Sequence, residues 1–427
     1  MKNKVKISSL VFILSIILLL FRFETEFNIL SLFISYILLL LSDFRITINL
    51  TSLKLLDYFL SAVLLLALPI LSIVLRKKFN AVSVHLNFTN ISVAVIIFVI
   101  LFAPIITNKN PNFQKNLSVT KLLPPLSKVE YLRFSNNTVD SNDVINFVQK
   151  KNRIVKQEFD ESLIFFSKIS IDSLIYVHQN NTVKTFEPSQ FENKNNSPIV
   201  YSKIYLFGTD EFGRDIFTRL IYGTRVSILI GLGAVFISIV LGFSFGALAG
   251  LLGGFIDRAL SRITDMFLAF PMIFLVVLII GLFGNSIFSI IIVLGFSGWM
   301  SLFKITKTEL VSLKNKDYFL SAQMIGLKKP QLLINEILPV ISAPIIVNII
   351  FQFGNVILAE AALSYLSLGI GNEFPSWGSM IQSGQSYITT AWWMIFFPSL
   401  FLVAALLTAK NLGDNLNVFL NPKLKND

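Results

Sequence analysis

The sequence predicts an all-α polytopic membrane protein with a small β or α+β insertion outside the bilayer. Hydrophobic residues make up 54% of the 427-residue chain and charged residues only 14%, and the mean hydropathy is +0.71. Two or three soluble domains of this total length would carry far more charge. Several apolar stretches approach the about 20 residues that cross a bilayer as a helix. One long polar stretch, residues 107–203, lies between them.

The composition also excludes several kinds of site. The chain has no cysteine and only two histidines, His85 and His178. Disulfides, thiolate metal sites, cysteine nucleophiles and Cys/His zinc clusters are therefore excluded. The 36 basic residues outnumber the 25 acidic ones, but membrane proteins concentrate Lys and Arg in their cytoplasmic loops. We therefore expect no catalytic residues, no metal or cofactor site and no nucleic-acid partner.

Glycine divides the chain into two parts. All 21 glycines lie between Gly208 and Gly413, so the first 207 residues contain none. Small residues let membrane helices approach each other closely. We therefore expect a tightly packed or moving helix bundle over residues 204–427 and an accessory membrane segment over residues 1–80. Residues 90–106 supply the first core helix, ahead of the insertion.

The glycine-free half contains four apolar stretches, at residues 7–21, 27–42, 55–75 and 91–106. No small-x-small cleavage site follows the first stretch, so we interpret it as a membrane segment and not as a signal peptide. The basic cluster at residues 76–78 should be cytoplasmic. Three full crossings before this cluster would place the N-terminus outside, against the three lysines that precede the first stretch. Either one early stretch does not cross fully, or these lysines do not set the orientation.

The insertion at residues 107–203 carries 13 basic and 9 acidic residues and many asparagines. It is too long for a simple loop. Short apolar runs at residues 162–166 and 169–177, bounded by Asn-rich turns, predict strands. The alternative is a partly disordered, Asn-rich insertion. Neither interpretation includes a catalytic constellation.

Five further apolar stretches follow, at residues 226–252, 266–283, 286–303, 338–359 and 392–409. With residues 91–106 they make six core spans. Residues 304–336 carry six lysines against three acidic residues, whereas residues 361–391 carry neither Lys nor Arg. The positive-inside rule therefore places the first segment in the cytoplasm and the second outside. Alternation then places residues 107–225 outside and the C-terminus in the cytoplasm.

A polar block with the sequence FGTDEFGRD, residues 207–215, leads the chain back into the membrane. Its candidate residues are Gly208, Thr209, Asp210, Gly213, Arg214 and Asp215. An aspartate near a helix N-terminus can cap it, and an arginine can pair with a carboxylate. We favour a capped helix at the membrane surface, without ligand contact, over a binding role.

A second block, GGFIDR at residues 253–258, begins a cytoplasmic turn. Asp257 can pair with the neighbouring Arg258, and Arg262 can pair with Asp265. We expect these pairs to have a structural role at the inner membrane surface.

A third block, KDYFLSAQMIGLKKPQLLINEILP at residues 316–339, connects two core spans. A short helix ending at Gly326 can be followed by a basic turn over residues 328–330 and by a second helix. Such a compact helical pair would be a rigid knob on a membrane domain, suited to transmitting movement. The alternative is an ordinary loop that obeys the positive-inside rule.

A fourth block, EAALSYLSLGIGNEFPSWG at residues 360–378, follows another span. Its glycines and proline permit a re-entrant turn, which is tolerated at membrane depth only when buried or facing a water-filled cavity. An acid at the end of a span is a functional hypothesis by default, and the alternative for Glu360 is a snorkelling or capped carboxylate. The candidate residues for a pathway or external gate are Glu360, Ser364, Gly369, Trp377 and Gly378.

These four blocks, in this order, resemble the inner-membrane permease subunits of binding-protein-dependent ABC importers. The resemblance is to the peptide and nickel class, in its OppC/DppC-like branch, and covers roughly residues 90–427. It implies a six-helix type I importer permease core that pairs with a second permease subunit, which we expect to be a different chain. Two ATPase subunits and an extracytoplasmic solute-binding protein complete the expected importer in a bacterial inner membrane.

The resemblance identifies residues 317–339 as the cytoplasmic coupling loop, the EAA loop of the family, whose short helices dock into an ATPase subunit. The candidate coupling residues are Leu320, Ser321, Ala322, Gly326, Lys328, Leu338 and Pro339. The glutamate of the E-A-A pattern is replaced by Leu320, whereas the alanine, the glycine and the Leu-Pro pair keep their spacing. No G-x-x-x-x-G-K-[ST] motif occurs, so this chain cannot hydrolyse ATP by a P-loop mechanism. We expect ATP and Mg²⁺ on the partner ATPases.

The resemblance also implies a function: an ATP-driven importer subunit, for oligopeptides or dipeptides, that works by alternating access. Two alternatives are a secondary transporter and a membrane scaffold that is not driven by ATP. Ion coupling would require ionisable residues within the spans, and the six core spans contain almost none. A membrane-embedded enzyme would need a nucleophile with a base or metal ligands, and the sequence shows no such cluster.

Overall fold

The computed structural model describes residues 7–42, 50–74, 87–107, 109–135, 143–155, 163–171, 174–180, 182–194, 197–314, 316–317, 324, 331, 337–371 and 374–420. The chain forms two compact units. The first comprises Met1–Arg225 and Ser383–Phe397, and the second comprises Val226–Gln382 and Pro398–Asp427.

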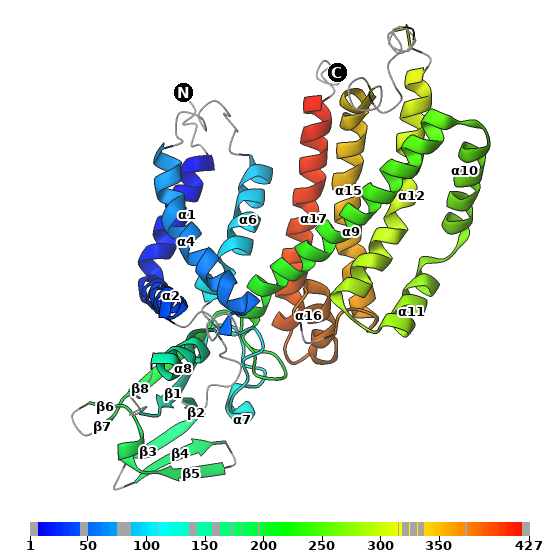
Figure 1. The fold of residues 1–427 in the computed structure, drawn as a ribbon. Helices are drawn as coiled ribbons and strands as arrows, with labels where there is room; N and C mark the ends of the chain where they lie inside the picture. The colour runs from blue at the N-terminus through cyan, green and yellow to red at the C-terminus, as the bar shows by residue number, and fades with distance from the viewer. Residues whose placement is uncertain are drawn as a thin grey trace, which may run out of the picture. The chain divides into compact units, whose positions relative to one another are not determined.

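The N-terminal membrane helices belong to the first unit. They are α1 (Ile7–Phe21), α2 (Phe23–Ser42), α4 (Leu53–Val74) and α6 (Phe88–Thr107) (Figure 1). Each contains one of the four predicted apolar stretches almost completely. Runs of Leu, Ile, Val and Phe exclude water from the backbone, so hydrogen bonds within the helix are the available way to satisfy its N–H and C=O groups.

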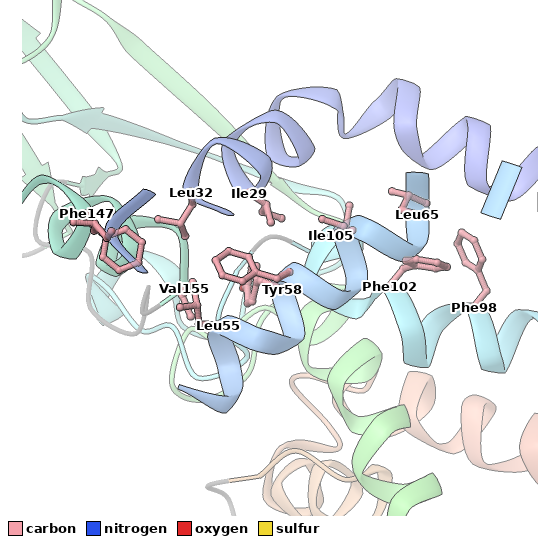
Figure 2. Packing of buried hydrophobic residues seen from close by; sticks show 13 residues of the cluster. Ile29, Leu32, Leu55, Tyr58, Leu65, Phe98, Phe102, Ile105, Phe147 and Val155 are labelled. Carbon is pink, nitrogen blue, oxygen red and sulfur yellow. The ribbon is translucent and has the colours of Figure 1, made fainter. Parts of the chain in front are cut away.

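One apolar cluster joins α2, α4 and α6 to a helix of the insertion, α8 (Asp143–Val155) (Figure 2). Leu32 of α2 and Leu55 of α4 are fully buried in it, and Phe147 of α8 is nearly so. Tyr36 of α2 contacts Phe147 with ring centroids 6.1 Å apart. The accessory helices and the insertion are therefore parts of one packed body.

The described part of the insertion holds two three-stranded antiparallel sheets and a short hairpin. The first sheet has the order β2 (Leu163–Phe166), β1 (Ser127–Arg133), β8 (Val200–Tyr205). The second has the order β3 (Lys168–Ile171), β4 (Ile175–Gln179), β5 (Thr182–Phe186). The hairpin is β6 (Asn193–Lys194) with β7 (Ser197–Pro198), and two short helices are α7 (Leu117–Thr120) and η1 (Pro188–Gln190).

The predicted small α+β insertion is confirmed, with one difference in its strands. The apolar run predicted as a single strand over residues 169–177 supplies two, β3 and β4, and Ile171 pairs with Ile175. The polar pair Asp172–Ser173 interrupts this run in the sequence, and such residues favour turns over strands.

Strand β2 is covered on both faces, since all four of its side chains are buried. Leu163 and Phe165 pack in a cluster with Val129 of β1, whereas Ile164 and Phe166 pack in a cluster with residues of β4. Alternate side chains of a strand point to opposite faces. The insertion therefore has two small apolar cores and is a folded domain, not a disordered Asn-rich segment.

The remaining helices form the core. They are α9 (Ile216–Leu252), α10 (Gly254–Ala269), α11 (Met272–Phe283), α12 (Ile287–Lys314), α15 (Leu338–Tyr365), α16 (Trp377–Gly384), η3 (Gln385–Tyr387) and α17 (Trp393–Leu420) (Figure 1). Among the described helices, α2, α4, α6, α9, α12, α15 and α17 are long and apolar enough to cross a membrane. The predicted polytopic all-α architecture is confirmed.

The apolar stretch predicted as one span over residues 266–283 is interrupted. It is shared between α10 and α11, which meet at an angle of 88°. Pro271 has no N–H to continue a helix, and it disfavours helical backbone at the preceding residue. Phe270 accordingly takes an extended ψ of 124°. Helix α11 by itself has 12 residues, or about 18 Å, too short to cross the bilayer.

Three glycines of α9, spaced four residues apart, face α12 in the second unit. A Cβ on Gly242 would lie 2.6 Å from the carbonyl oxygen of Trp299, and Cβ atoms on Gly246 and Gly250 would lie 2.7 Å from the Cβ atoms of α12 residues. Only glycine permits so close an approach of two helices. We call Gly242, Gly246 and Gly250 the glycine seam. It confirms the close packing expected of the glycine-containing part of the chain.

Candidate functional site

Within the predicted coupling loop, the structure describes only residues 317, 324, 331 and 337–339. Leu320, Ser321, Ala322, Gly326 and Lys328 lie outside the described residues. Leu338 and Pro339 form the first turn of α15. A proline fits the first turn of a helix because the N–H that it lacks would have no partner there. The Leu-Pro pair thus marks the start of the helix that follows the loop.

Both helices that flank the loop are held in one apolar cluster of the second unit. Leu310 and Leu313 near the end of α12 pack in the same cluster as Ile337 and Ile341 at the start of α15. The ammonium of Lys314, the last residue of α12, donates a hydrogen bond to the carbonyl oxygen of Leu251 at 2.8 Å. The ends of α9, α12 and α15 beside the loop are therefore joined to one another.

The carboxylates of α10 are paired with lysines of α12. Asp257 lies 2.5 Å from the ammonium of Lys307, and Asp265 lies 3.3 Å from that of Lys304. The sequence had suggested local partners, Arg258 and Arg262, within the same helix. The structure replaces these with partners from another helix, because α10 lies beside the later half of α12. The structural role expected for this block fits these contacts.

The block at residues 207–215 forms a buried polar knot in the first unit. Asp210 and Arg214 are almost fully buried, and the Arg214 Nε donates to Asp210 Oδ2 at 2.6 Å. Asp210 Oδ1 accepts hydrogen bonds from the backbone N–H groups of Phe212 and Arg214, at 2.9 and 2.8 Å. The Arg219 Nε lies 3.7 Å from Asp210. We call Asp210, Arg214 and Arg219 the charged joint.

The neighbouring residues tie this joint to the insertion and to the start of α9. Thr209 Oγ1 donates to the carbonyl oxygen of Thr120 at 2.5 Å, and it accepts from the N–H of Leu123 at 2.8 Å. Asp215 Oδ1 accepts from the N–H of Phe217 at 3.2 Å, as an N-cap does. These contacts are the capping and pairing expected from the sequence, and all of them are made within the protein.

Two glycines of the block adopt backbone conformations that other residues avoid. Gly208 has φ of +78° and Gly213 has φ of +70°. A Cβ on Gly208 would also lie 2.4 Å from the carbonyl oxygen of Leu123.

Glu211 lies between these two glycines in the sequence. Burial raises the pKa of its carboxyl group, and the nearby Asp210 raises this pKa further.

Glu360 lies near the end of α15 and is 1% exposed. Its Oε1 accepts hydrogen bonds from the hydroxyls of Ser364 and Ser376, at 2.8 and 2.7 Å. Its Oε2 is buried and has no hydrogen-bond partner among the described residues. The carboxylate is therefore not a snorkelling group. It links α15 to the segment that precedes α16.

Trp377 and Gly378 strengthen this link. The N–H of Trp377 donates to Ser227 Oγ of α9 at 3.1 Å. A Cβ on Gly378 would lie 2.7 Å from the Cα of Ala361, and one on Gly369 would lie 2.1 Å from the hydroxyl of Ser364. The structure therefore brings all five residues proposed for an external gate into one compact group.

A small pocket of about 190 Å³ lies at the same place. Its lining residues are Ser364, Ser367, Gly369, Gly371, Ser379 and Gln382. Hydroxyl, amide and glycine backbone groups line it, and Ser364 belongs both to this lining and to the Glu360 group. The lining offers hydrogen bonds, and none of these six described residues is a His, Asp, Glu or Lys. Among the described residues no group of His, Asp and Glu could hold a metal ion.

The ion pair between Arg225 and Asp57 is among those that the sequence interpretation missed. Arg225 Nη1 of α9 lies 2.5 Å from Asp57 Oδ2 of α4. The same guanidinium donates to the carbonyl oxygens of Ile100 and Leu101 in α6, at 2.6 and 3.3 Å. A single acid inside an otherwise apolar span was the available signal, because such residues need a partner. Helix α4 is thereby fixed to the first core helix and to the start of α9.

Comparisons with known proteins agree with this architecture. The family model for the binding-protein-dependent transport system inner membrane component matches residues 239–426. A dipeptide transport system permease protein DppC of Alkalihalophilus pseudofirmus is 34% identical over 265 residues, which cover 61% of this chain and 87% of that protein. An oligopeptide transport system permease protein OppC of Bacillus subtilis is 36% identical over 224 residues, covering 52% of this chain and 73% of that protein.

A weaker similarity links the chain to a solved structure. A chain of the MetNI methionine ABC transporter in an inward-facing conformation is 15% identical, with 48% of this chain and 98% of that chain covered and a TM-score of 0.42. The family of the chain is shown instead by its identity to the permease relatives and by the share of their length that it covers. The chain therefore belongs to the family of binding-protein-dependent transport system inner membrane components, and it is a permease subunit of an ABC importer.

Proposed function

We propose that this chain forms one half of the translocation pathway of an ATP-driven importer of dipeptides or oligopeptides. The names of its relatives, which are dipeptide and oligopeptide permeases, support this substrate class. A second permease subunit, a different chain, forms the other half. Two ATPase subunits bind and hydrolyse ATP with Mg²⁺, and a solute-binding protein delivers the peptide at the outer face. This chain binds no cofactor of its own.

The packing of the helix ends beside the coupling loop is the observation that carries this proposal. Residues 317–339 connect α12 to α15, and both helices meet in one buried cluster next to the loop. ATPases that pull on the loop would thus move three core helices as one body. Rigid-body movement of packed helices is a common way to switch between two states.

The distribution of lysines supports the proposed orientation. Asp257 and Asp265 pair with lysines that lie in the segment assigned to the cytoplasm by the positive-inside rule. With this segment inside, the Glu360 group and its pocket face the outside. The C-terminus follows α17 into the cytoplasm.

The mechanism is alternating access. ATP binds better to the closed ATPase pair than to the open pair, so it shifts the transporter toward the state in which the ATPases are closed. The coupling loop passes this movement to α12 and α15. The Glu360 group, at the outer end of α15, then changes its position or its contacts as the pathway opens to each side in turn.

The test uses the full transporter with its partner subunits in proteoliposomes. Gly326→Trp in the coupling loop is expected to leave ATP hydrolysis in place and to abolish peptide uptake. Gly281→Trp is the control, because a Cβ on this helical glycine has no neighbour within 4 Å. Normal uptake by the Gly326→Trp variant would refute the coupling role.

A second arm of the same test separates this function from ion-driven transport. Uptake by the unaltered transporter should stop without ATP and should continue when ionophores remove the ion gradients. Uptake that follows the gradients and ignores ATP would instead establish a secondary transporter.

A further inference from the structure

Helix α2 has contacts that a membrane span cannot make, because both its start and its later half meet the same end of the neighbouring helices. Arg22, between α1 and α2, donates a hydrogen bond from Nη2 to the carbonyl oxygen of Ile106 at 2.8 Å. Ile106 is in the last turn of α6, next to the insertion. The Tyr36 hydroxyl of α2 forms a 2.8 Å hydrogen bond with Thr51 Oγ1, just before α4 begins.

Ile106 and Thr51 lie at one end of the helix group because α4 and α6 run antiparallel. Ser61 of α4 donates to the carbonyl oxygen of Leu101 in α6 at 2.8 Å, so the start of α4 lies beside the end of α6. From Arg22 to Tyr36 the chain advances about 21 Å along a helix. A helix perpendicular to the membrane would carry these two residues to very different depths. Figure 1 shows α2 nearly end-on, whereas α1, α4 and α6 run lengthwise.

We propose that α2 does not cross the membrane but lies in its plane at the outer surface, with one apolar stripe inserted among the acyl chains of the outer leaflet. Helices α1, α4 and α6 then make the crossings of the N-terminal part. The length and apolar composition of α2 qualify it as a span, but length and composition do not give its direction. The contacts of its two halves do.

The exposed apolar side chains of α2 form a single stripe. At about 100° per residue they fall within a sector of about 100°. They are Phe23, Phe27, Ile34, Ile37, Leu38 and Leu41, each between 39% and 79% exposed. Exposed apolar area of this extent on a membrane protein fits acyl chains, and its position beside three crossing helices makes it continuous with their lipid-facing surface.

A polar stripe runs beside the apolar one for the whole length of α2. Its members, Glu24, Asn28, Ser31, Ser35 and Ser42, also fall within about 60°. The opposite face, with Leu32 and Leu39, is buried in the protein cluster. Lipid on one side, water on the next and protein on the third is the pattern of an interfacial helix. If α2 crossed the membrane, the exposed Asn28 side chain would face hydrocarbon. Transfer of an amide from water to such surroundings without a hydrogen-bond partner costs about 2–7 kcal/mol.

This arrangement also removes the conflict in the N-terminal charges. With α2 outside the bilayer core, α1 runs from the cytoplasm to the outer surface and α4 returns. Both the lysines before α1 and the basic cluster at residues 76–78 then lie on the side that the positive-inside rule requires. Helix α1 has 15 residues, about 22 Å, and snorkelling lysines can extend so short a span.

The in-plane helix has a consequence for the insertion. Helix α8 packs on α2 through Phe147 and Tyr36, and the Lys151 ammonium donates to the carbonyl oxygen of Leu50. An outer-leaflet α2 therefore anchors the insertion at the membrane surface. The insertion is held close to the lipid and does not project from it on a flexible tether.

Cysteine labelling tests the direction of α2, and the absence of native cysteine makes the unaltered chain a clean background. In intact cells producing the whole transporter, Glu24→Cys should react with a membrane-impermeant maleimide. Lys4→Cys should react only after permeabilisation. The exposed Lys184→Cys in β5 serves as the outer reference and Lys316→Cys as the inner one. If Glu24→Cys reacts like the inner reference and Lys4→Cys like the outer one, α2 is a span and the proposal fails.

Depth measurements test the lipid contact. A fluorophore attached at Phe27→Cys, Ile34→Cys or Leu41→Cys is compared in vesicles whose lipids carry a nitroxide near the headgroup or near the end of the acyl chain. An in-plane helix predicts the same ratio of shallow to deep quenching at all three positions. Deeper quenching at Ile34 than at the two ends would show a span. Absence of quenching at all three would show that protein and not lipid covers the stripe, and this result would also overturn the proposal.

Discussion

The two units of the chain join their segments in different ways. In the first, the charged joint fixes the start of α9 through a buried carboxylate and two guanidinium groups. In the second, the glycine seam brings the α9 backbone close to the backbone and Cβ atoms of α12. The first 207 residues contain no glycine at all. The same helix, α9, thus uses charge at its start and close packing farther along.

The difference has a mechanical meaning. A buried charge cannot be left without its partner, so a joint made of ion pairs holds one geometry and resists any other. Contacts at a glycine seam are non-directional but close, so they hold α9 against α12 without any charged partner. We infer that the charged joint fixes the start of α9 beside the insertion, whereas the seam keeps α9 and α12 together when the core helices move as one body during transport.

The largest effect is expected when the charged joint is broken. Asp210→Ala leaves Arg214 and Arg219 buried without their carboxylate, and removing one partner of a buried pair costs about 3–5 kcal/mol. We expect a large drop in the thermal unfolding temperature of the detergent-solubilised transporter, together with a low yield of assembled complex.

The matched control for this change is Asp265→Ala. Its partner Lys304 is exposed, as is Asp265 itself, and exposed ion pairs contribute about 0–1 kcal/mol. If both variants lowered the unfolding temperature equally, burial would not make the charged joint stronger than an exposed ion pair. The charged joint would then not be the rigid part of the molecule.

The next largest effect is expected at the glycine seam. In Gly246→Leu the added side chain has no room, since a Cβ alone would lie 2.7 Å from the Thr306 Cβ. Overpacking of this kind costs about 1–3 kcal/mol. Because the seam keeps α9 and α12 together when they move as one body, peptide uptake should fall by a larger factor than the amount of folded transporter. Gly281→Leu in α11 is the control, since its position is open. Equal uptake per folded transporter in both variants would show that the seam has no role in movement.

Local features of the sequence could be predicted, because their partners lie a few residues away. The cap at Asp215 and the pairing of Asp210 with Arg214 follow from groups within four positions. The spans followed from apolar composition alone. The apolar residues on both sides of Pro271 led to the prediction of one span over residues 266–283, although the proline itself indicates the break between α10 and α11.

Contacts between distant segments could not be predicted. Asp257 and Asp265 have partners on α12, and the local partners expected for them were wrong. The pair of Asp57 with Arg225 joins residues 168 positions apart. The sequence did single out Glu360 as an acid at the end of a span, but not the hydroxyls that bind it. Such pairs depend on how helices pack, and one sequence carries no periodic signal for that.

A smaller loss of stability should follow when Glu360 loses one of its two serine hydrogen-bond partners in the second unit. Ser376→Ala removes one hydrogen bond to Glu360 and also the acceptor for the N–H of Ser379 at the start of α16. Loss of both should cost about 1–2 kcal/mol. Ser364→Ala removes only the bond to Glu360, at about 1 kcal/mol.

The order of these two variants, measured by thermal unfolding of the transporter, tests the assignment of Ser376 as a double anchor. A larger loss for Ser364→Ala would contradict it. Peptide uptake measured in the same preparations shows whether the Glu360 group works as a gate. A gate predicts that uptake changes in both variants even where stability barely does.

The smallest effect concerns Glu211, whose buried carboxyl group lies next to the charged joint. Burial raises the pKa of Glu211 in the folded chain. The unfolded chain therefore releases this proton at a lower pH, near the ordinary glutamate pKa of about 4.3. As pH rises through and above that value, ionisation favours the unfolded chain, and the folded chain loses stability.

Glu211→Gln has no such loss, so its unfolding temperature should exceed that of the unaltered chain at pH 7. This difference in unfolding temperature should disappear as the pH falls toward 4. Glu187→Gln, on the exposed surface of the insertion, removes the same charge and is the control. A difference that widens on acidification would mean that Glu211 is stabilised in its ionised form by Arg214 and belongs to the charged joint as a full member.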